Sequence, residues 1–124
     1  EDVVQNLPDI DFGDGVAAHI AVGDFHTCVI SESGKMKCWG DNSDGQLGYG
    51  DKKDRGKDAS TMGVNLPDIA FGTDSVVKQI ALGAHHTCAL FDTYTVKCWG
   101  GNGKGQLGYG DTKDRGHDDA TSGE

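Results

Sequence analysis

The sequence predicts an all-β protein built from two tandem antiparallel β-sheet blades, and three observations support this fold class. A duplicated pattern runs through the chain, short apolar segments alternate with turn residues, and glycine makes up 20 of 124 residues, about twice its ordinary share of roughly 7%. No window of about 11 residues keeps the i, i+3, i+4, i+7 apolar spacing of an amphipathic helix. We expect the blades to belong to a propeller-like assembly or to an open stacked repeat array.

The duplication divides the chain into two repeats, residues 1–64 and residues 65–124. The sequence Asn-Leu-Pro-Asp-Ile at 6–10 recurs at 65–69. Residues 20–58 match residues 80–118 at 23 of 39 positions. Self-similarity at this period is typical of repeat architectures, so we interpret each half as one blade.

Each half contains three short apolar segments that we interpret as strands. They are 16–22, 26–31 and 35–39 in the first half, and 76–82, 86–91 and 95–99 in the second. A weaker extended segment precedes each set, at 7–12 and at 66–71. Because so small a unit cannot bury both faces of its sheet, we expect neighbouring blades to pack face to face.

The four cysteines form one pair per repeat, Cys28 with Cys38 and Cys88 with Cys98. If residues 32–34 make a three-residue hairpin loop with a left-handed glycine at its end, the register places Cys28 opposite Cys38. The second repeat has Tyr94 in place of that glycine, so its turn must differ or be strained. We expect two disulfides and therefore an oxidising compartment. Free thiols and a zinc site that includes His26 are the alternatives.

The motifs at 20–28 and 38–48, repeated between 80 and 108, give the sequence a family resemblance. The combination of His-Thr, Trp-Gly-x-Asn and Gly-Gln-Leu-Gly, in that order and twice, resembles the regulator-of-chromosome-condensation repeat. The resemblance implies a propeller of seven blades, which would need roughly 400 residues. Its founding member catalyses nucleotide exchange on a small GTPase, whereas other relatives are secreted proteins, so fold alone does not select a function.

Several residues recur at equivalent positions and are assigned structural roles. Large repeated side chains in a glycine-rich sheet are expected to form its core, and the family resemblance indicates a structural hydrogen-bonding role for the repeated histidines. The core set is Trp39, Trp99, Leu47, Leu107, Tyr49, Tyr109, His26 and His86. Glycine accepts positive φ, so the expected turn glycines are Gly40, Gly45, Gly48, Gly100, Gly105 and Gly108.

Charge and composition argue against several classes of function. With 11 basic and 20 acidic residues, the net charge of −9 has the wrong sign for binding nucleic acid. No stretch approaches the roughly 20 apolar residues of a membrane-spanning helix, so no membrane insertion is expected. The acidic loops 51–58 and 111–118 contain basic residues that oppose calcium binding. We expect no catalytic residues, no metal and no cofactor.

Three functions are compatible with this pattern. The first is a non-enzymatic extracellular structural module that assembles through blade-to-blade packing, for example as a fibre subunit, with further copies of itself or further repeats of a longer chain as partners. The second is a protein-recognition propeller that grips a partner through the loops that differ between the repeats. The third is guanine-nucleotide exchange on a small GTPase.

Overall fold

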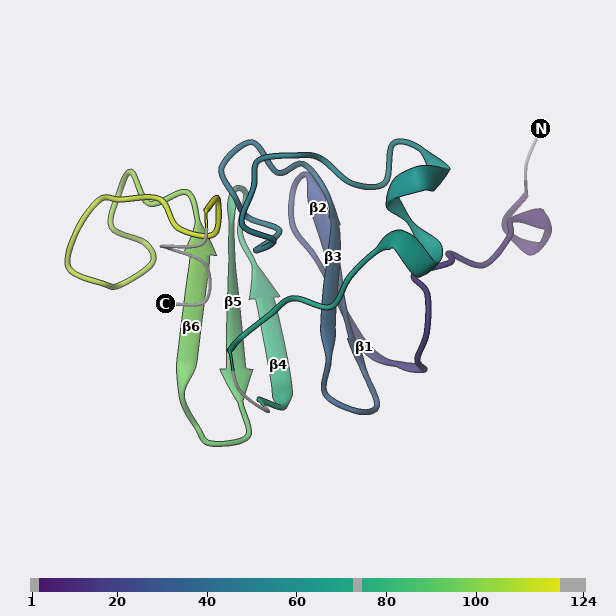
Figure 1. Ribbon diagram of the computed structural model, residues 1–124, viewed down its shortest axis with the longest axis horizontal. Coiled ribbons are helices and arrows are strands. Elements are labelled where there is room, and N and C mark those ends of the chain that lie inside the picture. The colour runs from purple at the N-terminus through teal and green to yellow at the C-terminus, as the bar shows by residue number, and fades with distance from the viewer. Residues whose placement is uncertain (1–2, 73–74, 119–124) are drawn as a thin grey trace.

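The computed structural model describes residues 3–72 and 75–118 and contains two three-stranded antiparallel sheets (Figure 1). The first sheet has the order β1 (Ala17–Val22), β2 (His26–Ser31) and β3 (Met36–Gly40). The second has the order β4 (Val77–Leu82), β5 (His86–Phe91) and β6 (Val96–Gly100). All six strands fall within one residue of the expected segments, and the all-β, two-blade fold class is confirmed.

Three single turns of 3-10 helix complete the elements, η1 (Val4–Asn6), η2 (Ala59–Thr61) and η3 (Gly63–Asn65). The weaker extended segments, 7–12 and 66–71, begin with extended backbone at Leu7 and Leu66 but do not form strands of the sheets. Each contains a proline, which cannot donate to a sheet ladder. Segment 66–71 nevertheless lies along the outer edge of β3, where the Ile69 amide donates to the Met36 carbonyl at 2.8 Å.

The two sheets lie side by side and enclose the core between them (Figure 1). Alternate residues of a strand point to opposite faces of its sheet. One face of the first sheet, formed by alternate residues of β2 and β3, points toward the second sheet. One face of the second sheet, formed by alternate residues of β5 and β6, points toward the first sheet. The buried side chains of this core are Cys28, Ile30, Met36, Cys38, Leu47, Ile69, Val77, Ala89, Phe91 and Trp99.

The two blades therefore share one buried junction. The other face of each sheet is not covered by a second blade among the described residues. The split into residues 1–64 and 65–124 stays a prediction, since the Ile69 contact carries part of the second repeat onto the first sheet. Within the described residues, no helix has the length and apolar character needed to cross a membrane.

Candidate protein-interaction site

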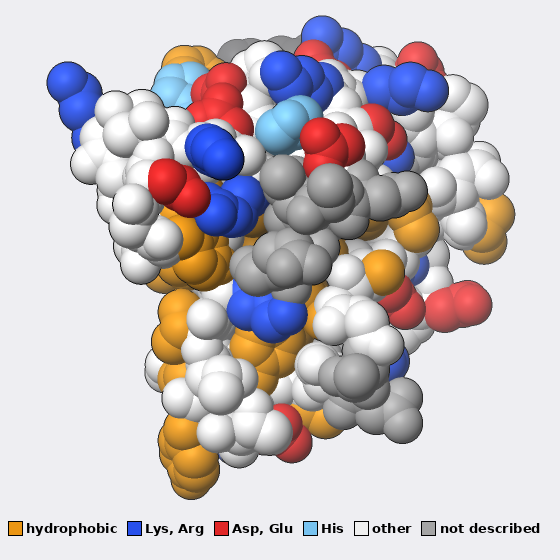
Figure 2. All heavy atoms as spheres, turned by 60° about the vertical axis from the view of Figure 1, so that its left-hand side comes forward, with side chains coloured by type: hydrophobic (Ala, Val, Ile, Leu, Met, Phe, Trp, Pro, Cys, Tyr) orange, Lys and Arg blue, Asp and Glu red, His pale blue; other side chains and the backbone are white. Residues whose placement is uncertain are grey.

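Several loops that differ between the repeats lie together at one end of the sheets, whereas the hairpin turns 32–35 and 92–95, which share no residue, lie at the other. The first group of loops follows β1 and β3 in the first blade and β4 and β6 in the second. The Phe25 ring stacks on the His85 imidazole across the junction, with ring centroids 6.0 Å apart. His85 Nδ1 also lies 3.5 Å from the Asp44 carboxylate. Figure 2 shows histidine, acidic and basic side chains together over this upper part of the molecule.

Phe25 is the most exposed aromatic side chain of this loop end. It is 62% exposed although it is large and apolar, while its counterpart His85 is the residue it stacks on. The neighbouring Lys57 ammonium pairs with Asp54 at 2.8 Å, and its counterpart His117 contacts Asp118 at 3.3 Å. An exposed aromatic ring ringed by charged groups is typical of a protein-binding surface.

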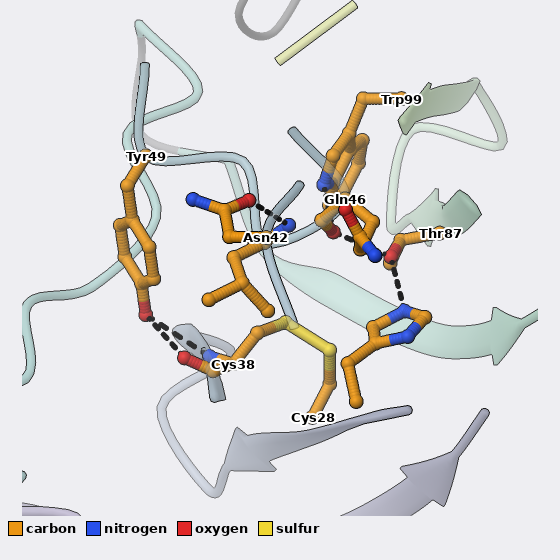
Figure 3. The surroundings of a disulfide bond; sticks show 9 residues. Cys28, Cys38, Asn42, Gln46, Tyr49, Thr87 and Trp99 are labelled. Carbon is orange, nitrogen blue, oxygen red and sulfur yellow. Dashed lines mark hydrogen bonds between the residues drawn. A yellow bond between two sulfur atoms is a disulfide. The ribbon is translucent and has the colours of Figure 1, made fainter. Parts of the chain in front are cut away.

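A buried polar cluster ties the two blades together beneath these loops (Figure 3). The Thr87 hydroxyl donates to the Gln46 carbonyl at 2.7 Å, and the Trp99 indole N–H donates to the same carbonyl at 3.0 Å. His26 Nε2 lies 2.9 Å from the Thr87 oxygen. Because the threonine proton is used on Gln46, His26 Nε2 must be the donor. Nδ1 of His26 is then unprotonated, buried and without a hydrogen-bond partner among the described atoms.

Burial lowers the pKa of the His26 side chain to about 4. Nearby Asp41 opposes this shift, whereas His86 and His85 add to it. The imidazole is therefore neutral at neutral pH, which matches its role as a single hydrogen-bond donor. A neutral histidine that donates to a threonine and lacks an orienting carboxylate has no nucleophile to activate.

Both cysteine pairs are disulfides, with S–S distances of 2.02 Å. Cys28 faces Cys38 and Cys88 faces Cys98 in the strand register, as the hairpin count predicts. The disulfide prediction is confirmed, and the free-thiol and zinc alternatives are wrong because both sulfur atoms of each pair are bonded. No described group of three or more His, Cys, Asp or Glu side chains could hold a metal ion.

A buried asparagine organises the long loop after each third strand. The Asn42 side chain donates to the Asp51 carbonyl and carboxylate and to the Lys53 carbonyl, and it accepts from the Leu47 amide. Its own backbone amide donates to Asp54 at 2.8 Å. Asn102 makes the same set of bonds in the second blade. The acidic loops are therefore folded structures held from within.

Tyrosine and arginine fasten the same loops to the sheets. The Tyr49 hydroxyl donates to the Cys38 carbonyl and accepts from the Cys38 amide, and burial raises the pKa of Tyr49 above its ordinary value. Arg55 lies 4.2 Å over the Tyr49 ring and pairs with Asp51. Burial raises the pKa of Asp51, but hydrogen bonds from Arg55 and the Lys53 amide outweigh it and lower the pKa.

The second blade repeats this arrangement with Tyr109, Arg115 and Asp111. Hydrogen bonds from Arg115 and the Lys113 amide lower the pKa of Asp111 to about 2.

The expected core residues divide according to the blade that covers them. Trp99, Leu47, Leu107 and His26 are buried, whereas Trp39, Tyr49, Tyr109 and His86 are only partly buried. Trp99 packs against the first blade and is 2% exposed. Trp39 occupies the same position on a face that no second blade covers among the described residues, with Ile10 and Phe12 beside it, so it remains half-buried.

The six expected turn glycines all have positive φ, between +73° and +114°. Space adds a second requirement at some of them. A Cβ at Gly48 would lie 2.7 Å from the Trp99 indole nitrogen, and one at Gly40 would lie 2.5 Å from the Phe25 carbonyl. At Gly105 the nearest atom is 3.8 Å away, and at Gly108 none lies within 4 Å. The packing requirement at Gly48 thus depends on the covering blade, whereas Gly40 and Gly100 are both crowded by their own blade, with Cβ contacts of 2.5 and 2.4 Å.

Sequence reasoning missed the residues that carry the junction and the loops. Thr87 and Gln46 join the blades, and Asn42 and Asn102 organise the loops, but none was assigned a role. A signal was present, because each is identical in both repeats. A polar residue repeated within a structural unit is a candidate for a buried hydrogen-bond network.

Comparison with known proteins identifies the family. Two models of the regulator of chromosome condensation (RCC1) repeat match the chain, one at residues 17–46 and 77–106 and the other at residues 33–90. The chain belongs to the RCC1 repeat family. The residues matched by the two models include the six strands, the four disulfide cysteines and the Gly-Gln-Leu-Gly loop of the first repeat.

Relatives from different biological settings share these repeats. The human X-linked retinitis pigmentosa GTPase regulator is 34% identical over 104 residues, which is 84% of this chain and 9% of that protein. The ultraviolet-B receptor UVR8 of Arabidopsis thaliana is 36% identical over 98 residues, 79% of this chain and 20% of the receptor. The chain therefore spans a fifth or less of these two relatives.

Solved structures show the same fold. Yeast RCC1 (Prp20) bound to Kap60 superimposes with a TM-score of 0.66 at 21% identity, over 90% of this chain and 25% of that chain. Human WBSCR16 gives a TM-score of 0.65 at 24% identity, over 86% and 26%. At these identities the likeness concerns the propeller-blade fold alone.

Proposed function

We propose that this chain is a non-enzymatic protein-recognition module, a segment of an RCC1-type propeller that binds a partner protein through the loop end over the blade junction. One observation carries the proposal: at the loop end over the junction, positions that differ between the repeats are brought into contact, Phe25 with His85 and Asp44 with His85. Phe25 and Asp24 replace His85 and Ala84 there, and Asp44 replaces Lys104. Variable loops on a rigid scaffold are where binding specificity is usually built.

The relatives support recognition more than a structural role. Yeast RCC1 is described in complex with Kap60 and in terms of its binding to Gsp1p and histones. None of the relatives named above supports an extracellular or fibre function. Since the fold itself does not select a partner, the identity of the partner has to come from experiment.

Photocrosslinking tests the proposal directly. A photoreactive amino acid placed at position 25 should capture a partner protein, whereas the same group at Val64, which is 87% exposed and belongs to η3 rather than to these loops, should not. The Phe25→Ala and His85→Ala variants should weaken binding of the captured partner by about tenfold without changing the unfolding midpoint. Equal capture from positions 25 and 64, or unchanged affinity, would argue against this surface.

The compartment is a separate proposal that rests on the disulfides. Cross-strand disulfides persist mainly in oxidising environments, so we propose an extracellular or secreted location for this chain. Iodoacetamide labelling of native protein that has not been reduced provides the test. Four unmodified cysteines are expected, and four alkylated cysteines would contradict the location.

Nucleotide exchange is the competing activity. One relative is named as a GTPase regulator, but the chain supplies only two blades of a much longer relative. We expect no stimulated nucleotide release from a small GTPase by this chain. Stimulated release would replace the recognition proposal with an exchange function.

A further inference from the structure

The segment Asn-Leu-Pro-Asp-Ile occurs twice with different surroundings. In the second copy, Leu66 and Ile69 are 1% and 6% exposed because the segment lies along β3. In the first copy, Leu7 and Ile10 are 53% and 60% exposed, and Figure 1 shows this segment running away from the sheets. The same apolar side chains are thus docked in one place and more than half exposed in the other, where Ile10 lines a surface hollow with Phe12 and Trp39.

The outer edge of β6 is the counterpart of the edge that receives the docked segment. On β3, the Met36 carbonyl accepts from the Ile69 amide at 2.8 Å, and the Met36 side chain is fully buried. Val96 holds the Met36 position on β6 and is 60% exposed. Val96 also lines a surface hollow with Leu90 and Cys88. An exposed strand edge beside an apolar hollow is suited to receive an extended segment.

The polar groups of the junction also recur, divided between the two uncovered faces. On the second blade, Gln106 is exposed and His86 half-buried, in the positions of Gln46 and His26. On the first blade, Thr27 and Trp39 are half-buried, in the positions of Thr87 and Trp99. Threonine and tryptophan, which donate to the glutamine carbonyl, are thus on one face, and the glutamine and the histidine are on the other, as they are across the observed junction.

Shape agrees with this complementarity. Phe25, Trp39, Gly56 and Lys57 line a hollow on the uncovered side of the first blade. The counterparts of Trp39 and Gly56 are Trp99 and Gly116, which receive the Gly45–Gln46 loop, with a Cβ at Gly116 only 2.4 Å from the Gly45 carbonyl. The loop at Gly105–Gln106 stands free on the second blade.

The two uncovered faces differ from the observed junction in the charge of one pair of facing residues. Within the chain, a Cβ at Gly101 would lie 3.5 Å from the Asp44 carboxylate. The residues at these positions on the uncovered faces are Asp41 and Lys104, which carry opposite charges. Docking of the two faces would therefore bring an acidic residue toward a basic one, and attraction is expected at that contact.

We propose that a second copy of this chain docks head-to-tail on the first, with its 6–10 segment along the outer edge of β6 and its Trp39 face over the Gln106 loop. The contact is heterologous, since different surfaces of the two copies meet, and it can continue into a ring or a filament. The backbone bond expected at its centre runs from the Ile10 amide to the Val96 carbonyl.

Sedimentation and light scattering of the full chain test the proposal. The wild-type mass should rise with concentration. Ile10→Asp removes the docking segment's apolar contact, and Val96→Lys removes that of the receiving edge. Each should weaken self-association by at least about tenfold. Both side chains are 60% exposed in the single chain, so circular dichroism should be unchanged. Val64→Asp is the matched control and should associate like wild type.

Mixing the two variants separates head-to-tail docking from other modes. Ile10→Asp retains the receiving edge and Val96→Lys retains the segment, so an equimolar mixture should form a 1:1 dimer that neither variant forms alone. Failure of the mixture to associate, or undiminished association of either variant alone, would overturn the proposal. A monomeric wild type up to millimolar concentration would overturn it as well.

Lys104→Glu provides an independent readout of the same contact. It places a carboxylate toward Asp41, so association should weaken, and the loss relative to wild type should be largest at low salt, where repulsion is least screened. Unchanged association of this variant at low salt would contradict the orientation of the two copies. The position 25 crosslinking result is independent of these measurements, because it reports capture of a different protein.

Discussion

Gly48 and Gly108 occupy the same position in the two blades but have different neighbours. Both have φ of +83°, so alanine strains the backbone equally. Only at Gly48 would the added Cβ meet the Trp99 indole, at 2.7 Å. We predict that Gly48→Ala costs about 1–3 kcal/mol of unfolding free energy more than Gly108→Ala, as overpacking does. Urea denaturation of the two variants measures the difference, and equal losses would show that the junction tolerates the methyl group.

Tyr94 is the one described residue other than glycine with positive φ, at +67°. Its hairpin has the same backbone hydrogen bonds as the first hairpin, in which Gly34 holds this position. Of the two expectations for this turn, a different turn or a strained one, the strained turn is therefore correct. The side chain is 90% exposed and contributes little packing. We predict that Tyr94→Gly stabilises the chain by about 1 kcal/mol, because the left-handed conformation costs roughly that much for other residues.

The reverse change at the equivalent position is the control for Tyr94. Gly34→Ala should destabilise the chain, since Gly34 has φ of +83° and a Cβ there would lie 2.5 Å from the Val76 side chain. Thermal unfolding followed by circular dichroism compares the two hairpins. A lower unfolding temperature for Tyr94→Gly would mean that the tyrosine ring contributes more than its conformation costs.

His26 makes the stability of the blade junction depend on pH. Its pKa is about 4 in the folded chain against about 6.5 in an unfolded one, so the unfolded state binds the proton first. The stabilisation is complete above pH 6.5 and is lost as the pH falls from 6.5 toward 4. We predict a falling unfolding midpoint over that window in denaturant titrations. His26→Gln should flatten this part of the profile.

The carboxyl groups give a separate signal at lower pH. The folded-state pKa values of Asp51, Asp54 and Asp111 lie below the ordinary value of 3.8. Their stabilisation is present above pH 3.8 and is lost as the pH falls further. The His26→Gln variant should keep this acid limb, and persistence of the fall between pH 6.5 and 4 in the variant would indicate that the histidine is not the source of the first window.

At the scale of the element, each long loop depends on one buried amide. Removal of the Asn42 side chain leaves the Leu47 amide and the Asp51 and Lys53 carbonyls without that partner. Each buried group left unpaired costs roughly 1–3 kcal/mol, so we predict that Asn42→Ala destabilises the chain by at least about 3 kcal/mol. The exposed Asn65 supplies the control, and Asn65→Ala should be close to neutral in urea denaturation.

The hairpins and the connecting segments differ in how far the sequence predicts them. Alternating apolar residues and a three-residue turn are sufficient for β2 and β3, because cross-strand pairing is local. Segment 66–71 looked like a weak strand, but Pro67 and the single ladder bond at Ile69 leave it outside the sheet. Its position against β3 depends on a neighbouring element, which a local pattern does not report.

At the scale of the whole molecule, blade stacking makes the two disulfides unequal. Cys28 and Cys38 are fully buried beneath the second blade, whereas Cys88 and Cys98 are partly exposed. Thiol–disulfide exchange requires access of the attacking thiolate to sulfur. We predict that Cys88–Cys98 is reduced first under native conditions. Graded dithiothreitol followed by alkylation and peptide mass spectrometry resolves the order, and simultaneous loss of both bonds would indicate reduction only through global unfolding.

The sequence by itself determined the all-β class, the duplication, the strand positions and the pairing of Cys28 with Cys38. These features depend on period-2 patterning and on the residue count across one hairpin, both of which are local. The family motifs around Trp39 and Trp99 added the propeller-blade expectation. The positive φ of the turn glycines also follows from the chemistry of short turns.

Only the tertiary structure decided which copy of each repeated residue is buried in the junction between the two blades. Trp39 and Trp99 have the same neighbours in the sequence, yet Trp39 is half-buried and Trp99 is 2% exposed. The contacts from Thr87 to Gln46 and from Phe25 to His85 join residues 41 and 60 positions apart. Such contacts arise when two sheets pack face to face. Because packing depends on which face another blade covers, identical residues acquire different burial and different neighbours.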